Sequence, residues 1–538
     1  MPWKKLTAFV LVSLLLSSGT ALCQEGLLRV VINDFSGGMN SNSLADILQP
    51  NQGASMVNVV TSQPGKLFKR KGQGLLAEDV GSTAFTGIGR FDPDKNTAYV
   101  VAASEVDVVR ATLGASSWTV INSASPLTTG KDTEFVQAND LLFILNGFDN
   151  TAWYNGNTWI EAGSYPSSPP TAAYGLWLRN YLFLAGNPEN EDWIYFSNNL
   201  EPHIFSANDI LKVNTGDGQV IQAIEPFRLN EIVIYKERSI FVLDITGTTP
   251  LTDWTVQPIS NSVGLAAPRA VVNLGNDQWF LSSDPIAIRS LARTQFDKIL
   301  LGFVSQPIQD IFDGTGDVTL NKAQIEKAAA VLFDNKFLLA FPTGTSLVNN
   351  TVAVYDFVTN SWSLISGWFP ADWIVQGNKL FYADANDGRV IECFVESEGD
   401  WLQGPNTITF ASTPTAAIQS VYMSPIVNFD RPDVFKMPDA VEVEFEPTGD
   451  YTADVYINLD NSGWQNIGTI NLAGTGSTLP ITLPNVLSNT GLARKTFQIQ
   501  NYGEFKKIQI MIRQSGVNQK MILHRIQLFA RPKPWRRE

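Results

Sequence analysis

Short apolar runs alternate with clusters of turn residues from about Phe85 to Cys393. Six runs have the length of a β-strand: Asp140 to Leu145, Tyr181 to Leu184, Ile232 to Tyr235, Trp279 to Ser282, Lys336 to Ala340 and Lys379 to Tyr382. Asn-Gly, Gly-Asp-Gly and Asn-Asp-Gly sequences separate such runs, and these sequences favour tight turns. The pattern predicts an all-β protein with antiparallel sheets through this region.

A tryptophan-containing phrase recurs within the same region. Its four copies are Ser117-Trp118, Thr158-Trp159, Asp253-Trp254 and Ser361-Trp362. The spacings of 41, 95 and 108 residues correspond to one, two and two units of about 40 to 55 residues, the range typical of propeller blades. We therefore predict a β-propeller of six or seven blades, in which ring closure removes the exposed sheet edges. A series of β-sandwiches is the alternative that the spacing leaves open.

A second domain is predicted beyond Trp401 to Asn406. Residues 441–446 alternate strictly between apolar and acidic side chains. Further strands are predicted at Val455 to Leu459, Thr496 to Gln500, Lys507 to Ile512 and Met521 to Phe529. About eight short strands in roughly 125 residues indicate a β-sandwich. A single helix is predicted from Thr319 to Val331, with Asn321 as its N-terminal cap.

The N-terminus has the three-part pattern of a secretory signal peptide: Lys4 and Lys5, an apolar run from Leu6 to Leu16, and small residues up to Ala21. Cleavage after Ala21 and cleavage after Cys23 both fit the pattern. The alternatives are an uncleaved anchor, a misassigned start codon and a lipoprotein modified at Cys23. The predicted organisation is a leader (1–23), an N-terminal arm with a hairpin (24–82), a propeller (83–400), a sandwich (401–530) and a basic tail (531–538).

The arm contains the signals of a basic hairpin. Met56 to Thr61 is a predicted strand, Gln63-Pro64-Gly65 has the residues of a type II turn, and Lys66 to Arg70 would be the returning strand. This hairpin is expected ahead of the first globular domain. Its lysines either protect a solvated sheet edge or contact a negatively charged partner or nucleic acid.

Composition excludes several functional classes. The net charge of −14, or −16 once a leader with Lys4 and Lys5 is removed, argues against a DNA-gripping module. Cys23 and Cys393 are the two cysteines, so a disulfide framework is excluded. His203 and His524 are the two histidines and lie far apart in the sequence, which argues against a histidine-based triad or metal site.

Three further patterns are interpreted as turns. Asn458 to Gly463 has the alternating oxygen ligands of a calcium loop but has Thr469 where a bidentate glutamate belongs, so a hairpin turn is expected. Asp384 to Gly388 is interpreted in the same way. Asn214 to Gly218 is glycine-rich, but no helix or lysine of a phosphate loop follows it. The sequence therefore predicts no catalytic, cofactor or metal site, although a carboxylate pair from distant blades stays open.

The order of motifs resembles the nozzle and tubular tail proteins of podovirus-type bacteriophages. In that family a "GG-(L/M)-N" opening precedes an "N-V" strand and a "G-x-L-x-(K/R)-R-x-G" strand. The matching residues here are Phe35 to Asn40, Asn51-Gln52, Asn58-Val59, Gly65-Lys66-Leu67 and Lys69 to Gly72. Matches continue at Leu178 to Gly186, Ile194 to Ser197, His203 to Phe205, Glu231 to Leu243, Gly264 to Pro268 and Trp279 to Ser282. The resemblance covers about half of the chain.

The resemblance implies a structural virion protein rather than an enzyme. Copies would form a ring, sixfold in that family, around the DNA exit channel, with an adaptor protein, tail fibre or tip proteins and the passing genome as partners. The expected contact residues are Phe35, Gly37, Gly38, Asn40, Lys66, Lys69, Arg70, Lys71, Arg531, Lys533, Arg536 and Arg537. A signal peptide conflicts with this location, because such tail proteins assemble in the host cytoplasm. The alternative is a secreted or periplasmic propeller, either a binding module or a carbohydrate-active enzyme.

Overall fold

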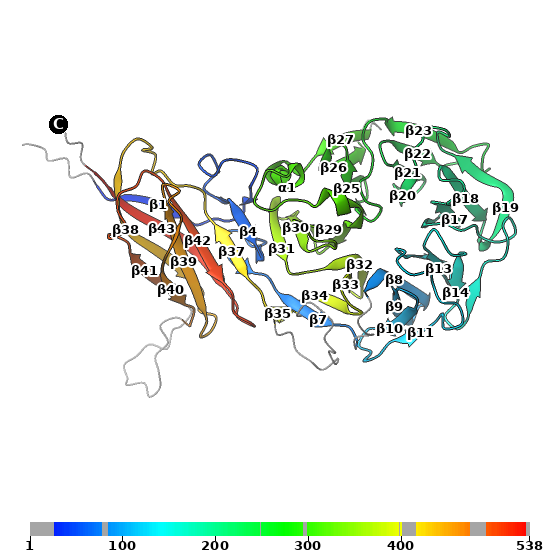
Figure 1. The fold of residues 1–538 in the computed structure, drawn as a ribbon, viewed down its shortest axis with the longest axis horizontal. Helices are drawn as coiled ribbons and strands as arrows, with labels where there is room; N and C mark the ends of the chain where they lie inside the picture. Colours follow the sequence, from blue (N-terminus) through cyan, green and yellow to red (C-terminus); the bar gives the residue numbers. More distant parts are fainter. Residues whose placement is uncertain are drawn as a thin grey trace, which may run out of the picture.

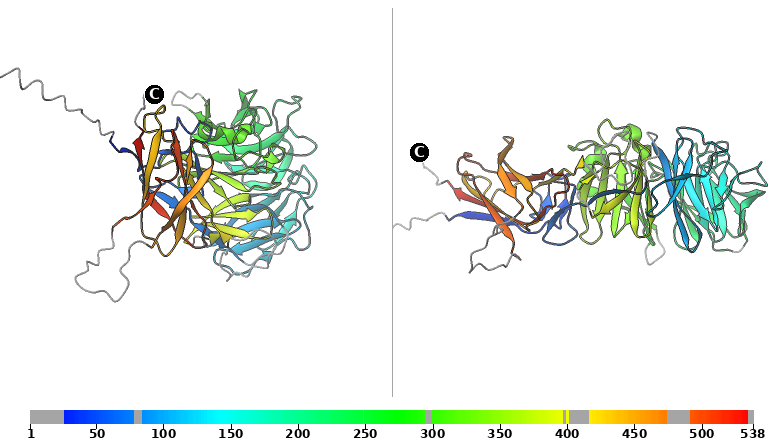
Figure 2. Two further views of the ribbon diagram at one scale, coloured as in Figure 1. Left: turned by 60° about the vertical axis from the view of Figure 1, so that its left-hand side comes forward. Right: turned by 90° about the horizontal axis from the view of Figure 1, so that it is seen from below.

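The chain folds into a ring of β-sheets and a β-sandwich that lie end to end (Figures 1 and 2). A computed structural model describes residues 26–77, 84–247, 249–293, 299–396, 399–400, 416–473 and 491–533. The ring is a β-propeller, and the described part of it contains seven blades of four antiparallel strands. The all-β prediction is confirmed, and of the two blade numbers considered the structure has seven.

The strands of blades 1 to 4 follow chain order. They are β8 (Phe85–Asp94), β9 (Thr97–Ser104), β10 (Val108–Thr112) and β11 (Thr119–Val120) in blade 1; β12 (Glu134–Ala138), β13 (Leu141–Leu145), β14 (Ala152–Tyr154) and β15 (Trp159–Glu161) in blade 2; β16 (Tyr174–Leu178), β17 (Tyr181–Ala185), β18 (Trp193–Asn198) and β19 (Glu201–Lys212) in blade 3; and β20 (Ile221–Pro226), β21 (Glu231–Lys236), β22 (Ile240–Asp244) and β23 (Thr255–Ser260) in blade 4.

Blades 5 to 7 continue the ring. Blade 5 contains β24 (Val271–Asn273), β25 (Asp277–Ser283), β26 (Ile286–Arg293) and β27 (Ile299–Phe303). Blade 6 contains β28 (Ala329–Phe333), β29 (Lys336–Phe341), β30 (Thr351–Asp356) and β31 (Ser361–Ser366). Blade 7 contains β32 (Pro370–Gln376), β33 (Lys379–Asp384), β34 (Val390–Val395) and β7 (Gly72–Leu75).

The six apolar runs of the sequence correspond to the second strands of blades 2 to 7: β13, β17, β21, β25, β29 and β33. These strands are buried almost throughout because neighbouring blades cover both of their faces, so they lack the alternation of a half-exposed strand. The tryptophan phrases lie at the fourth strands of blades 1, 2, 4 and 6. Their spacings therefore do correspond to one, two and two blades.

Strand β7 closes the propeller. It comes from the N-terminal arm and pairs antiparallel with β34, with Leu75 opposite Ile391 and Gln73 opposite Cys393. Blade 7 thus consists of three strands from the end of the propeller sequence and one strand from before its beginning. Closure of the ring therefore depends on residues about 320 positions apart.

The sandwich also takes strands from both ends of the described chain. One sheet contains β41 (Ala493–Gln498), β38 (Lys436–Phe445), β43 (Ile522–Pro532), β6 (Leu67–Lys69) and β5 (Val59–Val60), with β1 (Leu28–Ile32) paired to β43. The other contains β4 (Ser55–Val57), β37 (Ser420–Met423), β42 (Ile508–Gln514), β39 (Thr452–Leu459) and β40 (Trp464–Asn471). Two small sheets pair β2 (Gly38–Met39) with β3 (Gln52–Gly53), and β35 (Gly399–Asp400) with β36 (Ala416–Ala417).

The expectation that the arm lies ahead of the first globular domain is therefore wrong. The side chains of Met56 and Leu67 are completely buried in the core between the two sheets. Burying apolar surface is the dominant favourable contribution to folding, so the arm is drawn into the sandwich. The arm predicted at residues 24–82 is therefore not a separate unit, because strands within it belong to the sandwich and, at β7, to blade 7.

Blade 6 and the sandwich share one continuous nine-stranded sheet. The connection is a short parallel contact between β31 and β4, in which Leu364 lies opposite Val57. Both partners of this contact belong to the large hydrophobic core that extends from the propeller into the sandwich. The two parts are consequently joined by backbone pairing and by a common core.

The helix prediction is wrong in type and extent. Residues 322–327 form the 3-10 helix η2 (Lys322–Lys327), and β28 begins at Ala329. Asn321 does cap it, because its side chain accepts a hydrogen bond from the N–H of Ala323 at 3.2 Å. The alanines that favour a helix are instead required in the innermost strand of blade 6, so tertiary pairing overrides propensity. Two short helices, η1 (Gln306–Ile308) and α1 (Gln309–Asp313), were not predicted from the sequence.

The basic tail begins inside the sandwich rather than after it. Strand β43 continues to Pro532, which lies opposite Lys436, so Arg531 is part of a paired strand. The expected boundary at residue 530 is therefore corrected to the end of β43. The described N-terminal strand β1 pairs with the same strand, and both ends lie at the far end of the sandwich (Figure 2). Within the described residues, no helix is long and apolar enough to cross a membrane.

Candidate functional site: the arm junction and the propeller axis

The first motif of the arm packs where blade 6 meets the sandwich. Phe35 is 1% exposed and makes an edge-to-face contact with Tyr422, with ring centroids 5.2 Å apart. Gly38 has φ +64°, and a Cβ at this position would lie 2.5 Å from Cβ of Ser361. The N–H of Asn40 donates to the carbonyl of Gly53 at 2.9 Å. A glycine is thus required at Gly38 both by the backbone conformation and by the available space.

Gly37 occupies the same turn. Its N–H donates to the carbonyl of Asn51 at 3.1 Å, and a Cβ would lie 2.8 Å from Oδ1 of Asn51. The four motif residues therefore contact other parts of this chain. Their predicted role in intersubunit contact is corrected for Phe35 and Gly38, which are buried within the monomer. For Gly37 and Asn40 it stays a prediction.

The predicted hairpin is present. Strands β5 and β6 are antiparallel, with Val60 opposite Phe68, and the N–H of Lys66 donates to the carbonyl of Gln63 at 3.1 Å. Gly65 has φ +78°, as the third residue of a type II turn requires. The turn chemistry read from the sequence is therefore confirmed.

The basic residues of the hairpin have different environments. The Nζ of Lys66 lies 2.7 Å from a carboxylate oxygen of Glu446, and the half-exposed Lys71 pairs with Glu396. Lys69 is 4% exposed, and its Nζ donates to Oε1 of Gln514 at 2.6 Å. The expectation of an exposed basic strand is therefore corrected for Lys69, whereas Lys66 and Lys71 keep a predicted contact role.

Arg70 is the most buried of these basic residues, with 1% exposure. Its guanidinium pairs with the carboxylate of Asp400, with Nη1 and Oδ1 3.0 Å apart, and its Nε donates to Oδ1 of Asn58 at 2.8 Å. Its Cζ lies 4.8 Å from the ring centroid of Trp368, a cation–π distance. Arg70 thus joins the arm to the propeller, and its predicted contact with another subunit is wrong because the monomer itself buries it.

The C-terminal basic residues remain near the surface. Arg531 is exposed and lies 3.0 Å from Oδ1 of Asp439, and Lys533 pairs with Glu504. A contact role for these two residues stays a prediction. Arg536 and Arg537 lie outside the described residues.

Arg269 lies at the axis of the propeller, where the innermost strands converge. Its Nη2 donates to the carbonyls of Thr86 at 2.8 Å and Thr133 at 2.9 Å, and its Nε lies 3.6 Å from Oδ2 of Asp372. These partners belong to blade 1, the connection into blade 2, and blade 7. One guanidinium therefore braces segments from opposite ends of the propeller sequence.

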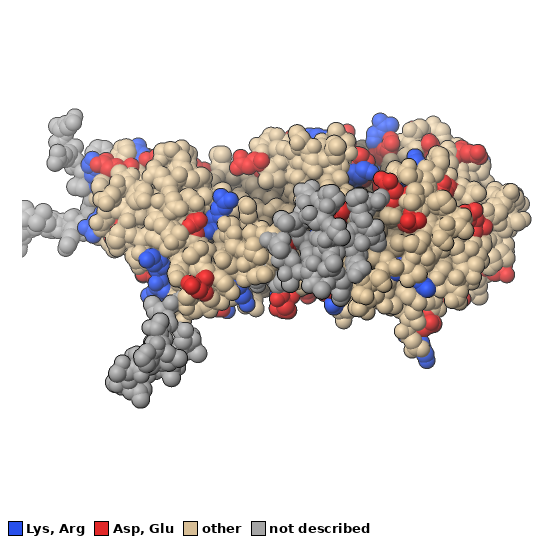
Figure 3. Space-filling model, turned by 60° about the horizontal axis from the view of Figure 1, so that its bottom comes forward, with Lys and Arg blue, Asp and Glu red and all other residues tan. Residues whose placement is uncertain are grey.

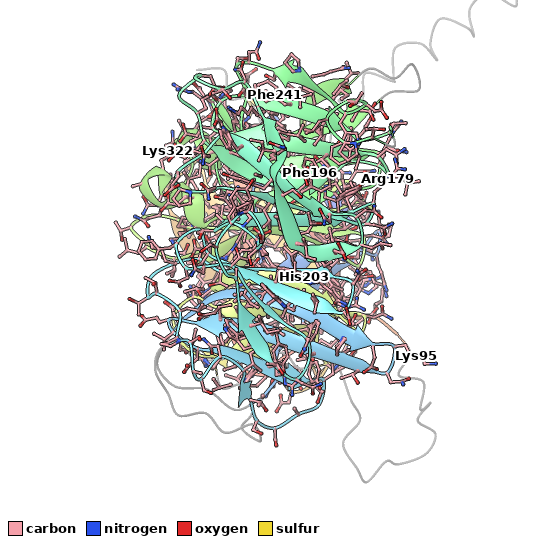
Figure 4. All side chains as sticks on the ribbon, turned by 90° about the vertical axis from the view of Figure 1, so that its right-hand side faces the viewer. Lys95, Arg179, Phe196, His203, Phe241 and Lys322 are labelled. Atoms are coloured by element: carbon pink, nitrogen blue, oxygen red, sulfur yellow. The ribbon has the colours of Figure 1, made fainter. Side chains whose placement is uncertain are left out.

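Two cavities share Glu134, Tyr174, Pro268 and Arg269 as lining residues. The first axial cavity, of about 310 Å³, is also lined by Asp132, Glu326 and Lys327. The second axial cavity, of about 340 Å³, is lined in addition by Arg90, Glu225, Asp372 and the isoleucines 88, 224 and 374. Figure 4 views the propeller from the end away from the sandwich, and the labelled Lys322 and Arg179 lie on its two opposite faces.

The carboxylates at the axis have altered pKa values. Burial raises the pKa of Glu134 to about 7, although a hydrogen bond from the N–H of Gly175 at 3.0 Å opposes this shift. Burial, together with the nearby charge of Glu134, raises the pKa of Glu225 to about 8. Burial also raises the pKa of Asp372, and Arg269 opposes that shift. The axis therefore holds carboxyl groups that change charge near neutral pH.

Sequence reasoning missed this cluster. The cluster comes from the innermost strands of blades 2, 4 and 7, which contain Glu134, Glu225 and Asp372. Each of these residues is the one acidic residue of its strand. A charged residue in the innermost strand of several blades is a usable signal. It can be recognised only after the repeat has been assigned strand by strand.

The other candidate sites of the sequence have structural roles. Asn458 to Gly463 is the turn between β39 and β40, and Oδ1 of Asn458 accepts from the N–H of Gly463 at 3.1 Å. Oδ1 of Asp217, in the glycine-rich loop, accepts from Nζ of Lys236 at 3.0 Å. His203 is exposed on β19 (Figure 4), and its ring lies tilted against that of Trp153, with the ring centroids 6.0 Å apart. No group of three or more His, Cys, Asp or Glu in the described part of the chain is arranged to hold a metal ion.

Comparisons with known proteins leave the family open. No protein-family model and no curated protein matches the chain. Among solved structures, the computationally designed protein Ika8 has a TM-score of 0.38 at 11% identity and covers 60% of this chain and all of its own. YCF48 bound to D1 peptide has a TM-score of 0.37 at 11% identity, covering 60% of this chain and 98% of its own. Exo-β-1,3-galactanase from Phanerochaete chrysosporium has a TM-score of 0.26 at 10% identity, covering 76% and 98%. These scores carry no functional argument.

Proposed function

We propose that this chain is a structural subunit of a bacteriophage tail, akin to nozzle and tubular tail proteins, and that its copies form a ring around the DNA exit channel. One observation carries the proposal: the arm residues of the resemblance form the joint between the propeller and the sandwich. Gly38 fits against blade 6, Gly65 forms the hairpin turn, and Arg70 pairs with Asp400. Motif residues with such specific structural roles are expected of a shared architecture rather than of a chance match.

The charge distribution is compatible with this role. Residues 84–400 contain 18 Lys and Arg against 36 Asp and Glu, a net charge of −18, whereas residues 26–77 and 416–533 together contain 16 against 12. On the face shown in Figure 3, the described Lys and Arg side chains are scattered rather than gathered into a broad basic patch. A lumen lined by propellers would repel DNA and let it slide.

The genome would pass through the centre of the ring of copies rather than through the axis of one propeller. Arg269, Glu134 and Tyr174 line both axial cavities and lie between them, and duplex DNA is far wider than either cavity. The proposed channel is therefore the axis of the ring of copies. Arg531 and Lys533, at the far end of the sandwich, are then candidates for contact with an adjacent tail component.

The experiment is mass spectrometry of nuclease-treated, density-purified particles from the source culture, together with native mass spectrometry of the purified chain. The proposal expects stoichiometric recovery beside the capsid and portal proteins, and a closed ring of copies. An intact Met1 in the particle would show that the leader is kept, whereas a start near Gly26 would show that it is removed. Absence from particles, with a trimmed chain in the periplasm or medium, would contradict the proposal.

A secreted or periplasmic binding module or carbohydrate-active enzyme is the second candidate. The observation favouring it is the axial pocket, where the carboxyl groups of Glu134, Glu225 and Asp372 converge with Tyr174. Pairs of carboxyl groups, one of them with a raised pKa, are the groups that glycoside hydrolysis employs. Recovery of the chain outside particles, combined with release of reducing sugar from polysaccharides that is abolished in E134Q and E225Q, would support this candidate.

A further inference from the structure

The outer strand of each propeller blade has one edge that no further strand of its own blade covers, and such an edge is a template for pairing with another strand. Of the seven outer strands in the described residues, six are protected. Strands β11 and β15 contain two and three residues, and β19 and β23 each contain a proline and a register shift. The other two protected strands are covered, because β31 pairs with β4 and β7 contacts β35.

Strand β27, the outer strand of blade 5, has none of these protections. Its sequence, Ile-Leu-Leu-Gly-Phe, contains no charge and no proline, and it pairs with β26 without a bulge. The side chains of Leu300 and Phe303 are 55% and 43% exposed. The strand lies on the rim of the propeller (Figure 1). Natural proteins avoid a regular, apolar and exposed edge of this kind unless another strand covers it.

The free hydrogen-bonding groups of β27 follow from its pairing with β26. The N–H of Val304 donates to the carbonyl of Ile288 at 2.9 Å, in the same register as the paired residues of the two strands. Peptide groups alternate in direction along an antiparallel strand. The N–H and C=O groups of Ile299, Leu301 and Phe303 therefore point away from β26.

We propose that β27 pairs antiparallel with β27 of a second copy of this chain, about a two-fold axis at Leu301. This is the one antiparallel register in which all five residues of both strands overlap. It places Ile299 opposite Phe303 of the second copy, and Leu300 opposite Gly302 of the second copy. A β-branched side chain then meets an aromatic ring, which is a favourable cross-strand pair, and the exposed Leu300 meets a residue that has no side chain.

The hydrogen-bonding groups match in the same register. The outward-pointing residues of the two strands face each other, Leu301 with Leu301 and Ile299 with Phe303. In a hydrogen-bonded pair of an antiparallel ladder, the two residues exchange both of their N–H···O bonds. Two copies thus satisfy the free groups of both strands, and the occupant of the edge is a second copy rather than a third chain. Such a self-complementary contact is the basis of two-fold dimers, the commonest oligomers.

Apolar surface continues beyond the strand. The N–H of Asn42 in the arm donates to the carbonyl of Pro307 at 3.1 Å, shortly after the end of β27. This hydrogen bond holds the arm loop, with the exposed side chains of Leu44 and Ile47, close to the strand. A specific interface buries at least about 1,200 Å², which is more than five paired residues supply, so the contact draws on this neighbouring surface.

The inference goes beyond the tail proposal and does not depend on it. A two-fold contact closes on itself and joins copies in pairs, whereas a ring is generated by head-to-tail contacts through other surfaces. Pairing through β27 therefore doubles the number of copies in whatever particle the other contacts form.

The first test is disulfide cross-linking of Leu301→Cys in a Cys23→Ser background, in which the remaining thiol, Cys393, is buried. In the proposed register the Cα atoms of the two copies of residue 301 lie about 5.5 Å apart, which a disulfide can bridge. Leu300→Cys is the matched control, because residue 300 is more exposed but lies too far from its counterpart. We expect covalent dimers to form roughly tenfold faster, or more, in Leu301→Cys than in Leu300→Cys.

A second test needs no cross-link. The N–H of Phe303 points away from β26, so Phe303→Pro is tolerated within the chain but blocks pairing with a second copy. Native mass spectrometry should show a particle of half the wild-type mass. Val120→Pro is the control, because its exposed residue lies on the outer strand β11 with its N–H also directed outward, and the mass should not change.

Two outcomes would overturn the inference. One is that Leu300→Cys cross-links as fast as Leu301→Cys, and the other is that a folded Phe303→Pro chain keeps the wild-type mass. Neither outcome bears on the ring of the tail proposal, and absence of a ring leaves both tests in force. Thermal unfolding of the two proline variants establishes that a loss of mass is not a loss of fold, and cross-linking alone decides if Phe303→Pro unfolds early.

Discussion

Arg70 of the N-terminal arm and Asp400, at the end of the propeller, form an ion pair in the protein interior although 330 positions separate them in sequence. The two residues lie where β6, blade 7 and the ring-closing strand β7 meet. Trp368 and Asn58 complete the surroundings of the guanidinium. This pair joins the arm to the segment that follows the last blade of the propeller.

Asp400→Ala should strongly destabilise the chain, because it leaves the guanidinium of Arg70 buried without its counter-ion. Removing one partner of a buried pair costs about 3–5 kcal/mol. Urea unfolding should show this loss, and the matched control is Glu396→Ala, which removes the exposed partner of Lys71. Equal midpoints for the two variants would contradict the structural importance of the Arg70–Asp400 pair.

Gly38→Ala should loosen the arm from blade 6. An added Cβ would lie 2.5 Å from Cβ of Ser361 and 2.8 Å from the carbonyl oxygen of Trp362, and φ is +64°. Gly114→Ala is the control, because φ is +85° there and nothing lies within 4 Å of the added atom. Strain at positive φ alone costs about 1 kcal/mol, so the additional loss of thermal stability in Gly38→Ala measures the steric contact. Equal losses would show that the contact can relax freely.

Glu225→Gln should stabilise the protein at alkaline pH and leave it nearly unchanged at pH 5. The pKa of Glu225 is raised to about 8 in the folded state, so between about pH 4.5 and 8 the folded chain binds more protons than the unfolded chain. Stability from this group is complete below that window and is lost as pH rises through it. Each unit of difference in pKa corresponds to about 1.4 kcal/mol.

The measurement is the unfolding free energy of wild type and E225Q from pH 5 to pH 9. The difference between them should grow with pH, and the exposed control E161Q should give a constant difference. A wild-type stability that rises through this window, with no gain in E225Q, would show that Glu225 is ionised at low cost in the folded protein.

The rate at which a thiol reagent labels Cys393 should report on how firmly β7 closes the propeller. Cys393 is 5% exposed, burial raises the pKa of its thiol, and Gln73 of β7 lies opposite it. In a chain that starts at Gly26, this is the single thiol. Leu75→Asp, which places a charge in the core of blade 7, should speed labelling by a thiol reagent at least tenfold, because each 1.4 kcal/mol of easier opening is a factor of ten.

The control for this labelling experiment is Leu229→Asp, an exposed position between β20 and β21. It introduces the same charge on a different blade and should leave the labelling rate unchanged. Equal labelling in Leu75→Asp and wild type would mean that β7 contributes little to the protection of blade 7.

The sequence by itself determined the local units of this protein. The apolar runs are the second strands of the blades. A strand that is buried on both faces needs apolar side chains at nearly every position, so it can be recognised from its own residues. The tryptophan spacing predicted blades, and Gln63-Pro64-Gly65 predicted a turn whose geometry depends on three residues alone. Each feature leaves its mark on a short stretch of sequence or on a regular repeat.

Only the tertiary structure decided what the arm and the axis do. Lys69 and Arg70 have the sequence of an exposed basic strand, and their burial depends on Gln514 and Asp400, which are distant in the chain. Glu134, Glu225 and Arg269 come from different blades and converge only when the ring closes. Charges can be buried where long-range partners compensate them, and sequence patterns of neighbouring residues do not contain those partners.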